Sequence, residues 1–185
     1  MNCNSLYQSR CLQIWGYSLP LVFVLLISGC ANHQTNIPAK ATTTMPQPEP
    51  DGSKWLVPSG WIALEPSRGL EIAAFEIPHV SGKVRVAVLR INDYEYGLLP
   101  NVNRWRSQIG LGPIEAGALS EISKPVETAS GDFGKAFQII GAEKSILAAA
   151  FVRGETSWFF KLIAPNALAE LQKDSFDVLI GSFHL

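Results

Sequence analysis

The feature that most constrains the fold is a pair of apolar segments near the end of the 185-residue chain. Residues 144–153 and 156–163 are separated only by Gly154 and Glu155, and a two-residue connection between strand-like runs is typical of a β-hairpin. Both runs are rich in large apolar side chains, namely Phe151, Val152, Trp158, Phe159 and Phe160. Because so apolar a hairpin must be kept from water, we expect helices to cover its sheet.

Other strands are predicted on both sides of a single helical segment. Alternation over residues 83–91 places Val84, Val86 and Val88 on one face of a strand. Further strand-like runs cover residues 70–77, closed by Pro78, and residues 123–130 and 135–140, which are separated by a turn-rich segment at 131–134.

Residues 100–109 give the clearest helix prediction in the first half of the domain. Val102, Trp105 and Ile109 recur at helical spacing and make one apolar stripe, and Gly110 is placed to end the helix. A second helical region begins at residues 165–166 and has an interrupted apolar face. The order of elements predicts an α+β fold, mainly an antiparallel β-sheet with packed helices, rather than an alternating βα fold.

Composition and charge exclude several classes of protein. The chain is 47% hydrophobic and 17% charged, which is typical of a packed globular protein and not of a disordered one. All 16 acidic residues follow Cys30, whereas one of the 15 basic residues, Arg10, precedes it. A net charge of −2 after Cys30 argues against a nucleic-acid partner, which requires a basic face.

Residues 1–29 have the layout of a signal peptide. A weakly charged segment precedes an apolar run at 19–27 that is far shorter than the roughly 20 residues needed to span a bilayer. Of the three cysteines, Cys3 and Cys11 lie in this segment, so Cys30 would be the only cysteine of the processed protein and no disulfide could form within it.

The end of that segment, Ile27-Ser28-Gly29-Cys30, resembles a bacterial lipobox. The resemblance implies that the cysteine sulfur receives a diacylglycerol, that cleavage occurs just before Cys30, and that the new amino group is acylated with a fatty acid such as palmitate. Several acyl chains give stable membrane anchoring. Ala31 in place of an aspartate is similar to Gram-negative lipoproteins of the outer membrane that face the periplasm; an ordinary signal peptide followed by an unrelated cysteine is the alternative.

Residues 30–53 are rich in Asn, Gln, Thr and Pro and lack apolar periodicity, so we expect the lipidated cysteine to be followed by a disordered tether. Residues 54–185 are expected to form a single globular α+β domain.

Two resemblances cover this domain. Residues 101–108 (Asn-Val-Asn-Arg-Trp-Arg-Ser-Gln), 158–161 and 176–183 resemble a family of uncharacterised bacterial exported proteins and lipoproteins, which brings no established activity. More distantly, the Pro-Ser-Gly-Trp opening at 58–61 and the Ser-Phe ending at 182–183 resemble the PsbP-like α/β/α sandwich, whose members are mostly accessory or binding proteins of larger assemblies.

Catalytic, metal and cofactor chemistry finds little support in the sequence. The histidines after Cys30 are His33, His79 and His184, and none stands in a pattern with a nucleophile and a carboxylate. Asp93 and Glu95 are a possible carboxylate pair, but two such residues in a loop are usually a solvated turn. We therefore expect no catalytic residue, no metal and no cofactor, and hence not an enzyme.

The remaining candidate site is a polar sector of the predicted helix, formed by Asn101, Arg104 and Gln108, with Asn103 and Lys161 as further candidates. An arginine fork flanked by amides suits a carboxylate, a phosphate or a partner's backbone. The alternative is structural, with Arg104 and Arg106 in intramolecular ion pairs and Asn101 or Asn103 capping the helix.

The sequence thus favours a membrane-anchored, non-catalytic lipoprotein whose domain binds a protein partner or assembly in the cell envelope. A periplasmic small-ligand carrier, or an enzyme with an unrecognised site, is the alternative. A deep apolar cavity under the strands would favour the carrier, and a filled core with an exposed patch would favour the partner-binding protein.

Overall fold

The computed structural model describes residues 47–48, 54–67, 69–80, 82–92 and 97–184. The predicted signal peptide, Cys30 and the carboxylates of Asp93 and Glu95 lie outside these residues, as does most of the predicted tether. Within the tether range, Gln47–Pro48 (β1) pairs antiparallel with Lys54–Trp55 (β2).

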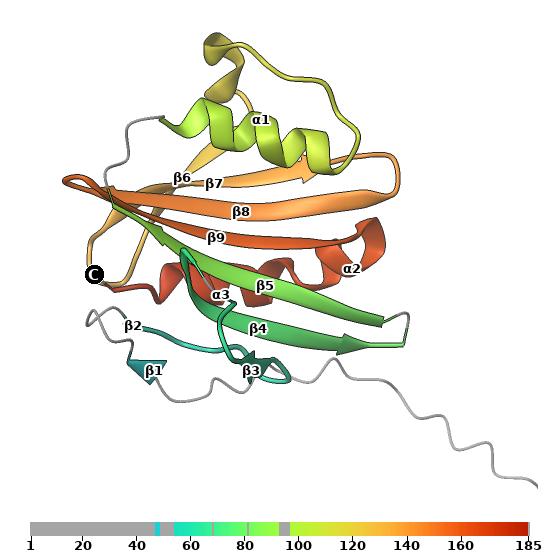
Figure 1. Cartoon of the computed structure of the whole chain (residues 1–185), viewed down its shortest axis with the longest axis vertical. Coiled ribbons are helices and arrows are strands. Elements are labelled where there is room, and N and C mark those ends of the chain that lie inside the picture. The colour runs from blue at the N-terminus through green and yellow to red at the C-terminus, as the bar shows by residue number, and fades with distance from the viewer. Residues whose placement is uncertain (1–46, 49–53, 68, 81, 93–96, 185) are drawn as a thin grey trace, which may run out of the picture. The chain divides into compact units, whose positions relative to one another are not determined.

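The domain is built on one seven-stranded antiparallel sheet with the order β3-β4-β5-β9-β8-β7-β6. Its strands are Ile62–Leu64 (β3), Glu71–His79 (β4), Gly82–Ile91 (β5), Ser123–Glu127 (β6), Phe133–Ile140 (β7), Lys144–Arg153 (β8) and Thr156–Pro165 (β9). The helices are Leu98–Gln108 (α1), Asn166–Leu171 (α2) and Lys173–Gly181 (α3), and Ala116–Leu119 forms a short 3₁₀ helix (η1). Figure 1 shows α1 on one side of the sheet and α2 and α3 on the other. The predicted α+β fold with helices packed on an antiparallel sheet is confirmed.

The central hairpin is confirmed as β8 and β9, which pair along their whole length. Gly154 opens the two-residue turn with a φ of 60°, a left-handed conformation that glycine adopts without a steric penalty. Ten consecutive residue pairs join β8 to β9, and β5 pairs with the other edge of β9. The hairpin therefore lies at the centre of the sheet.

Alternation along the central strands gives the sheet two buried faces. Toward α2 and α3 lies a large core that includes Leu147, Phe151, Phe160, Leu179 and Phe183, each at most 3% exposed. Toward α1 lies a smaller core that contains Val102, Trp105, Phe137, Ile146 and Phe159. The space on both sides of the central strands is therefore filled with apolar side chains.

The helix boundaries differ modestly from those expected. Helix α1 starts at Leu98, two residues earlier than predicted, so that Pro100 lies within its first turn, where a proline is tolerated. Gly110 follows its end with a φ of 77°, as expected of a C-terminal stop. The last helical region is two helices, which meet at Gln172.

Proline 78 does not end its strand. Strand β4 continues to His79, and Pro78 pairs with Lys83 of β5. Strand β3 pairs with β4 only as far as Glu76. Pro78 thus lies at an edge position of the sheet, where a proline is tolerated in a strand.

Candidate functional site

Two cations, Arg104 of α1 and Lys161 of β9, are each hydrogen-bonded to a neutral side-chain amide of α1. Arg104 donates from Nη2 to Oδ1 of Asn101 at 2.6 Å, and Lys161 donates from Nζ to Oε1 of Gln108 at 3.3 Å. Four of the five predicted site residues are therefore brought together. We call Asn101, Arg104, Gln108 and Lys161 the cationic flank of α1.

The period of the helix and the pleat of the sheet explain this arrangement. Asn101, Arg104 and Gln108 are separated by three and four residues, so they project from the same side of α1. On β9, Lys161 lies two residues from Phe159, whose ring packs against Trp105 of α1, so both side chains point to the α1 face.

The neighbours of Lys161 in the sheet are small. It pairs with Ala87 of β5 on one side and with Ala148 of β8 on the other. These methyl groups leave space for the aliphatic stem of the lysine, while its ammonium group reaches the polar side of the helix. Lys161 is accordingly half-buried, whereas Arg104 is exposed.

Burial and a like charge both act on Lys161. Burial lowers the pKa of Lys161, the nearby Arg104 guanidinium lowers it further, and the Glu71 carboxylate opposes them. Within the described residues, neither Arg104 nor Lys161 forms an ion pair. Two positive charges are thus held close together by amide oxygens that do not neutralise them.

The carboxylate that acts on Lys161, that of Glu71, is already paired. Glu71 forms an ion pair with Arg85 and accepts hydrogen bonds from the backbone N–H and the hydroxyl of Ser67, at 2.6 and 2.7 Å. Burial by itself raises the pKa of Glu71, but the hydrogen bonds from Arg85 and Ser67 outweigh it and hold the pKa below its ordinary value. Glu71 therefore borders the cationic flank as a charged and paired carboxylate.

Asn103, the fifth predicted residue, lies elsewhere and has a structural role. Its side chain donates to the carbonyl of Ile114 at 3.0 Å and accepts from the N–H of Ile114 at 2.8 Å, which ties the loop after α1 to the helix. Arg106 supports the same loop through a 2.7 Å hydrogen bond from Nε to the carbonyl of Gly112.

The structural alternative for the arginines and asparagines is wrong in detail. Within the part of the chain that the structure describes, Arg104 and Arg106 bind oxygens of an amide and a carbonyl rather than carboxylates. The residue at the N-cap of α1 is Gly97, and no side chain caps that end. Asn101 instead donates to the carbonyl of Gly97 at 3.3 Å from within the first turn.

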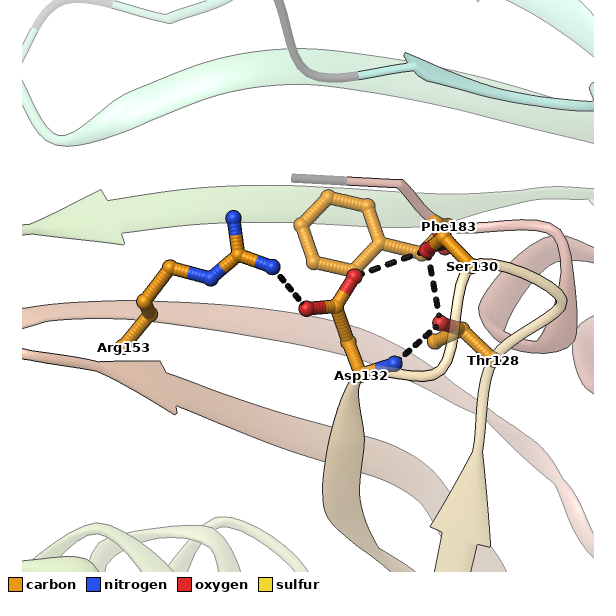
Figure 2. A network of polar contacts seen from close by, with 5 residues as sticks. All are labelled: Thr128, Ser130, Asp132, Arg153 and Phe183. Carbon is orange, nitrogen blue, oxygen red and sulfur yellow. Dashed lines mark hydrogen bonds and ion pairs between the residues drawn. The ribbon is translucent and has the colours of Figure 1, made fainter.

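A second polar cluster was missed by sequence reasoning. Figure 2 shows Thr128, Ser130, Asp132 and Arg153 linked in a polar network, in which Ser130 reaches the carbonyl of Phe183. The Thr128 hydroxyl accepts from the N–H of Asp132 at 3.0 Å, and Asp132 forms an ion pair with Arg153. The Ser130 hydroxyl lies 2.7 Å from Oδ2 of Asp132 and 3.2 Å from the Phe183 carbonyl.

This cluster fixes the C-terminal segment. It joins the turn between β6 and β7 to β8 and to Phe183, the second residue after α3, and the backbone adds a bond from the N–H of Ala129 to the carbonyl of Gly181 at 2.8 Å. The Ser-Gly-Asp sequence at 130–132 signals a turn, but no local pattern indicates that the turn meets Phe183, which is 53 residues away from Ser130.

In the described part of the chain, no helix has the length and apolar character required to cross a bilayer. Among the same residues, histidines, cysteines and carboxylates nowhere gather in threes as metal ligands would.

Comparison with known proteins gives similarity of structure alone. No protein-family model and no curated protein sequence matches the chain. The chain is similar to cyanobacterial PsbP (CyanoP) from Synechocystis, with 15% identity and a TM-score of 0.48, over 80% of this chain and 95% of that one. It is also similar to a protein from Bacteroides thetaiotaomicron, with 14% identity and a TM-score of 0.36, over 71% of this chain and 44% of that one. At these values neither likeness bears on activity, and the layered arrangement of helices and sheet rests on the strand order and helix positions given above.

Proposed function

We propose that this chain is a non-catalytic, membrane-anchored lipoprotein whose globular domain binds a protein partner or assembly in the bacterial cell envelope. The observation that carries the binding role is the cationic flank, where Arg104 and Lys161 each bind a neutral amide of α1 and the charge of Arg104 acts on Lys161. Burial and the charge of Arg104 both disfavour the charged form of Lys161 and Glu71 offsets them only in part, so an anionic partner would recover energy.

The chemistry of the flank supports binding rather than catalysis. The exposed guanidinium of Arg104 and the amide of Gln108 offer hydrogen-bond donors that can orient an anion. The filled interior on both faces of the sheet favours a protein partner over a small ligand carried under the strands. Lys161 would then serve as a charged donor at the edge of an interface.

The anchor is proposed from the sequence. The lipobox-like Ile27-Ser28-Gly29-Cys30 and the Ala31 that follows it favour attachment to the outer membrane of a Gram-negative cell, on the side that faces the periplasm. The motif at 101–108 favours membership of the family of uncharacterised exported proteins, and the cationic flank supplies the role that this motif would have.

Replacement of the cysteine tests the anchor. Cys30→Ser removes the sulfur that would carry the diacylglycerol, so the protein should move from the membrane fraction to the soluble fraction of the envelope. Immunoblots of fractionated cells, with mass spectrometry of the processed N-terminus, measure this. An uncleaved Cys30→Ser protein that stays in the membrane would show that residues 1–29 act as a transmembrane anchor instead.

The binding role is tested by capture from detergent-solubilised envelopes with the full-length protein as bait. Arg104→Gln should lose the specific partner, because the fork that contacts it is gone. Lys135→Gln is the matched control, since Lys135 is an exposed residue of β7 and its replacement changes the net charge equally. Equal recovery of the partner with both variants would refute a role for the cationic flank.

A further inference from the structure

We propose that the cationic flank recognises side-chain carboxylates in an acidic segment of the protein partner. This inference rests on the proposed function, because it names the chemistry of the partner at the same site. The carboxylate would lie between the guanidinium of Arg104 and the ammonium of Lys161, within reach of the amide of Gln108.

Arg104 and Lys161 retain N–H donors with which to bind such a carboxylate. A guanidinium carries five N–H donors and an ammonium carries three. Among the described residues, Arg104 gives one hydrogen bond from its guanidinium, to Asn101, and Lys161 gives one to Gln108. The remaining donors of the exposed guanidinium suit the planar, two-oxygen geometry of a carboxylate.

The charge balance favours an anion at this site. Arg104 and Lys161 supply two positive charges, and the carboxylate of Glu71 acts on Lys161 from nearby. Glu71 cannot move aside, because Arg85 and Ser67 hold it. Because Glu71 is already paired with Arg85, it leaves the flank with an excess of positive charge, which attracts an anion.

The sheet surface beside Lys161 also suits a polypeptide. Ala87 is the direct partner of Lys161 on β5, and Leu89, two residues further along, is only partly buried. These apolar side chains lie on the α1 face of the sheet, next to the charges. A glutamate or aspartate side chain brings methylene groups and a backbone that can cover them, which a free inorganic anion lacks.

The test is an NMR titration of the full-length protein with an N-acetylated, C-amidated peptide of alternating glutamate and glycine. The peptide should shift the side-chain signals of Gln108 and Lys161, and the matching glutamine–glycine peptide should not. Arg104→Gln should weaken binding about tenfold, which corresponds to about 1.4 kcal/mol for loss of a charge-assisted hydrogen bond. Lys135→Gln should bind as the unmodified chain does.

A second variant guards against misfolding. Lys161→Gln keeps a polar side chain at the same position, and it should also weaken peptide binding while leaving the dispersion of the backbone amide signals unchanged. Binding should weaken as pH rises, because the ammonium group loses the proton with which it attracts the carboxylate. A pH-independent affinity would contradict a contact with Lys161.

Three further outcomes would overturn the inference. The first is that the protein binds the glutamine peptide as tightly as the glutamate peptide. The second is that inorganic phosphate displaces the glutamate peptide at a concentration equal to or below that of the peptide. The third is that the protein binds phosphatidylglycerol vesicles but not the peptide. If the peptide fails but Arg104→Gln still loses a partner in envelope capture, the proposed function stands and only its acidic chemistry is wrong. If both experiments fail, the proposed function fails as well.

Discussion

At the scale of single residues, Lys161 lies where a lysine costs stability. Its pKa is lower in the folded protein than in the unfolded chain, so the folded state binds fewer protons. The cost is therefore fully present below the folded pKa, and it disappears as pH rises above the unfolded value of about 10.4. The proposed binding role would account for a charged residue at a position where a neutral one would be more stable.

Lys161→Met should accordingly raise the free energy of unfolding at pH 7 by a few tenths of a kcal/mol, because solvent reaches the half-buried ammonium and screens much of the effect. The gain should vanish in urea unfolding measured near pH 11. Lys135→Met, at an exposed position, is the control and should change little at either pH. A less stable Lys161→Met protein at pH 7 would contradict the assigned electrostatic cost.

At the scale of elements, the turn between β6 and β7 holds the end of α3 against the sheet. Thr128 is only 4% exposed, and its hydroxyl accepts the hydrogen bond from the N–H of Asp132 across the turn. Through Ser130 and Asp132 the same turn reaches the carbonyl of Phe183 and the guanidinium of Arg153. The C-terminal segment is thus fixed by side-chain hydrogen bonds as well as by apolar contacts.

Thr128→Val keeps the shape of the side chain but removes this acceptor. It should destabilise the domain by about 1–3 kcal/mol, because the N–H of Asp132 loses its partner in a poorly hydrated site. Chemical denaturation measures the loss, and hydrogen exchange should show faster opening of residues 128–132 and 181–183. Ser120→Ala, at an exposed hydroxyl of the loop after α1, should change stability little. Unaltered exchange in Thr128→Val would refute the role of the turn.

At the scale of the whole domain, one sheet is shared by two cores. Trp105 of α1 packs edge-to-face against Phe137 and Phe159 on one side. On the other, Phe183 lies against Phe151 and Phe160, with ring centroids 5.1 and 4.9 Å apart. Because β8 and β9 contribute to both cores, loss of either face should expose the strands that the other face needs.

Trp105→Ala and Phe183→Ala should therefore each lower the free energy of unfolding by about 3–5 kcal/mol, the usual cost of truncating a buried aromatic side chain. Each variant should still unfold in a single transition, with near- and far-ultraviolet circular dichroism changing together. Two separate transitions in Trp105→Ala would show that α1 and its core unfold independently of the rest.

Much of the fold was predictable from the sequence, because its signals are local. Alternation marked β5, a two-residue turn marked the β8–β9 hairpin, and an apolar stripe ended by Gly110 marked α1. The prediction that Pro78 ends its strand was wrong. A proline lacks the N–H that a neighbouring strand would accept, but β3 does not extend alongside Pro78, so no hydrogen bond to β3 is lost there.

The candidate site was predictable only in part. The spacing of Asn101, Arg104 and Gln108 placed them on one side of a helix, whereas Asn103, two positions from Asn101, does not share that side and was wrongly added to them. In the structure the amide of Asn103 instead binds the backbone N–H and C=O of Ile114, eleven residues further along the chain.

The sequence by itself determined the central strands, helix α1 and its polar side, since a period of two or 3.6 residues is a property of neighbouring positions. Only the tertiary structure decided that Lys161 meets this side of the helix and that Phe183 meets the turn at 128–132. Both contacts depend on the order of strands in the sheet, where β5 pairs with β9 although α1, the 3₁₀ helix η1 and three strands lie between them in the chain. That order is set by how all the apolar faces are buried together, and no local pattern encodes it.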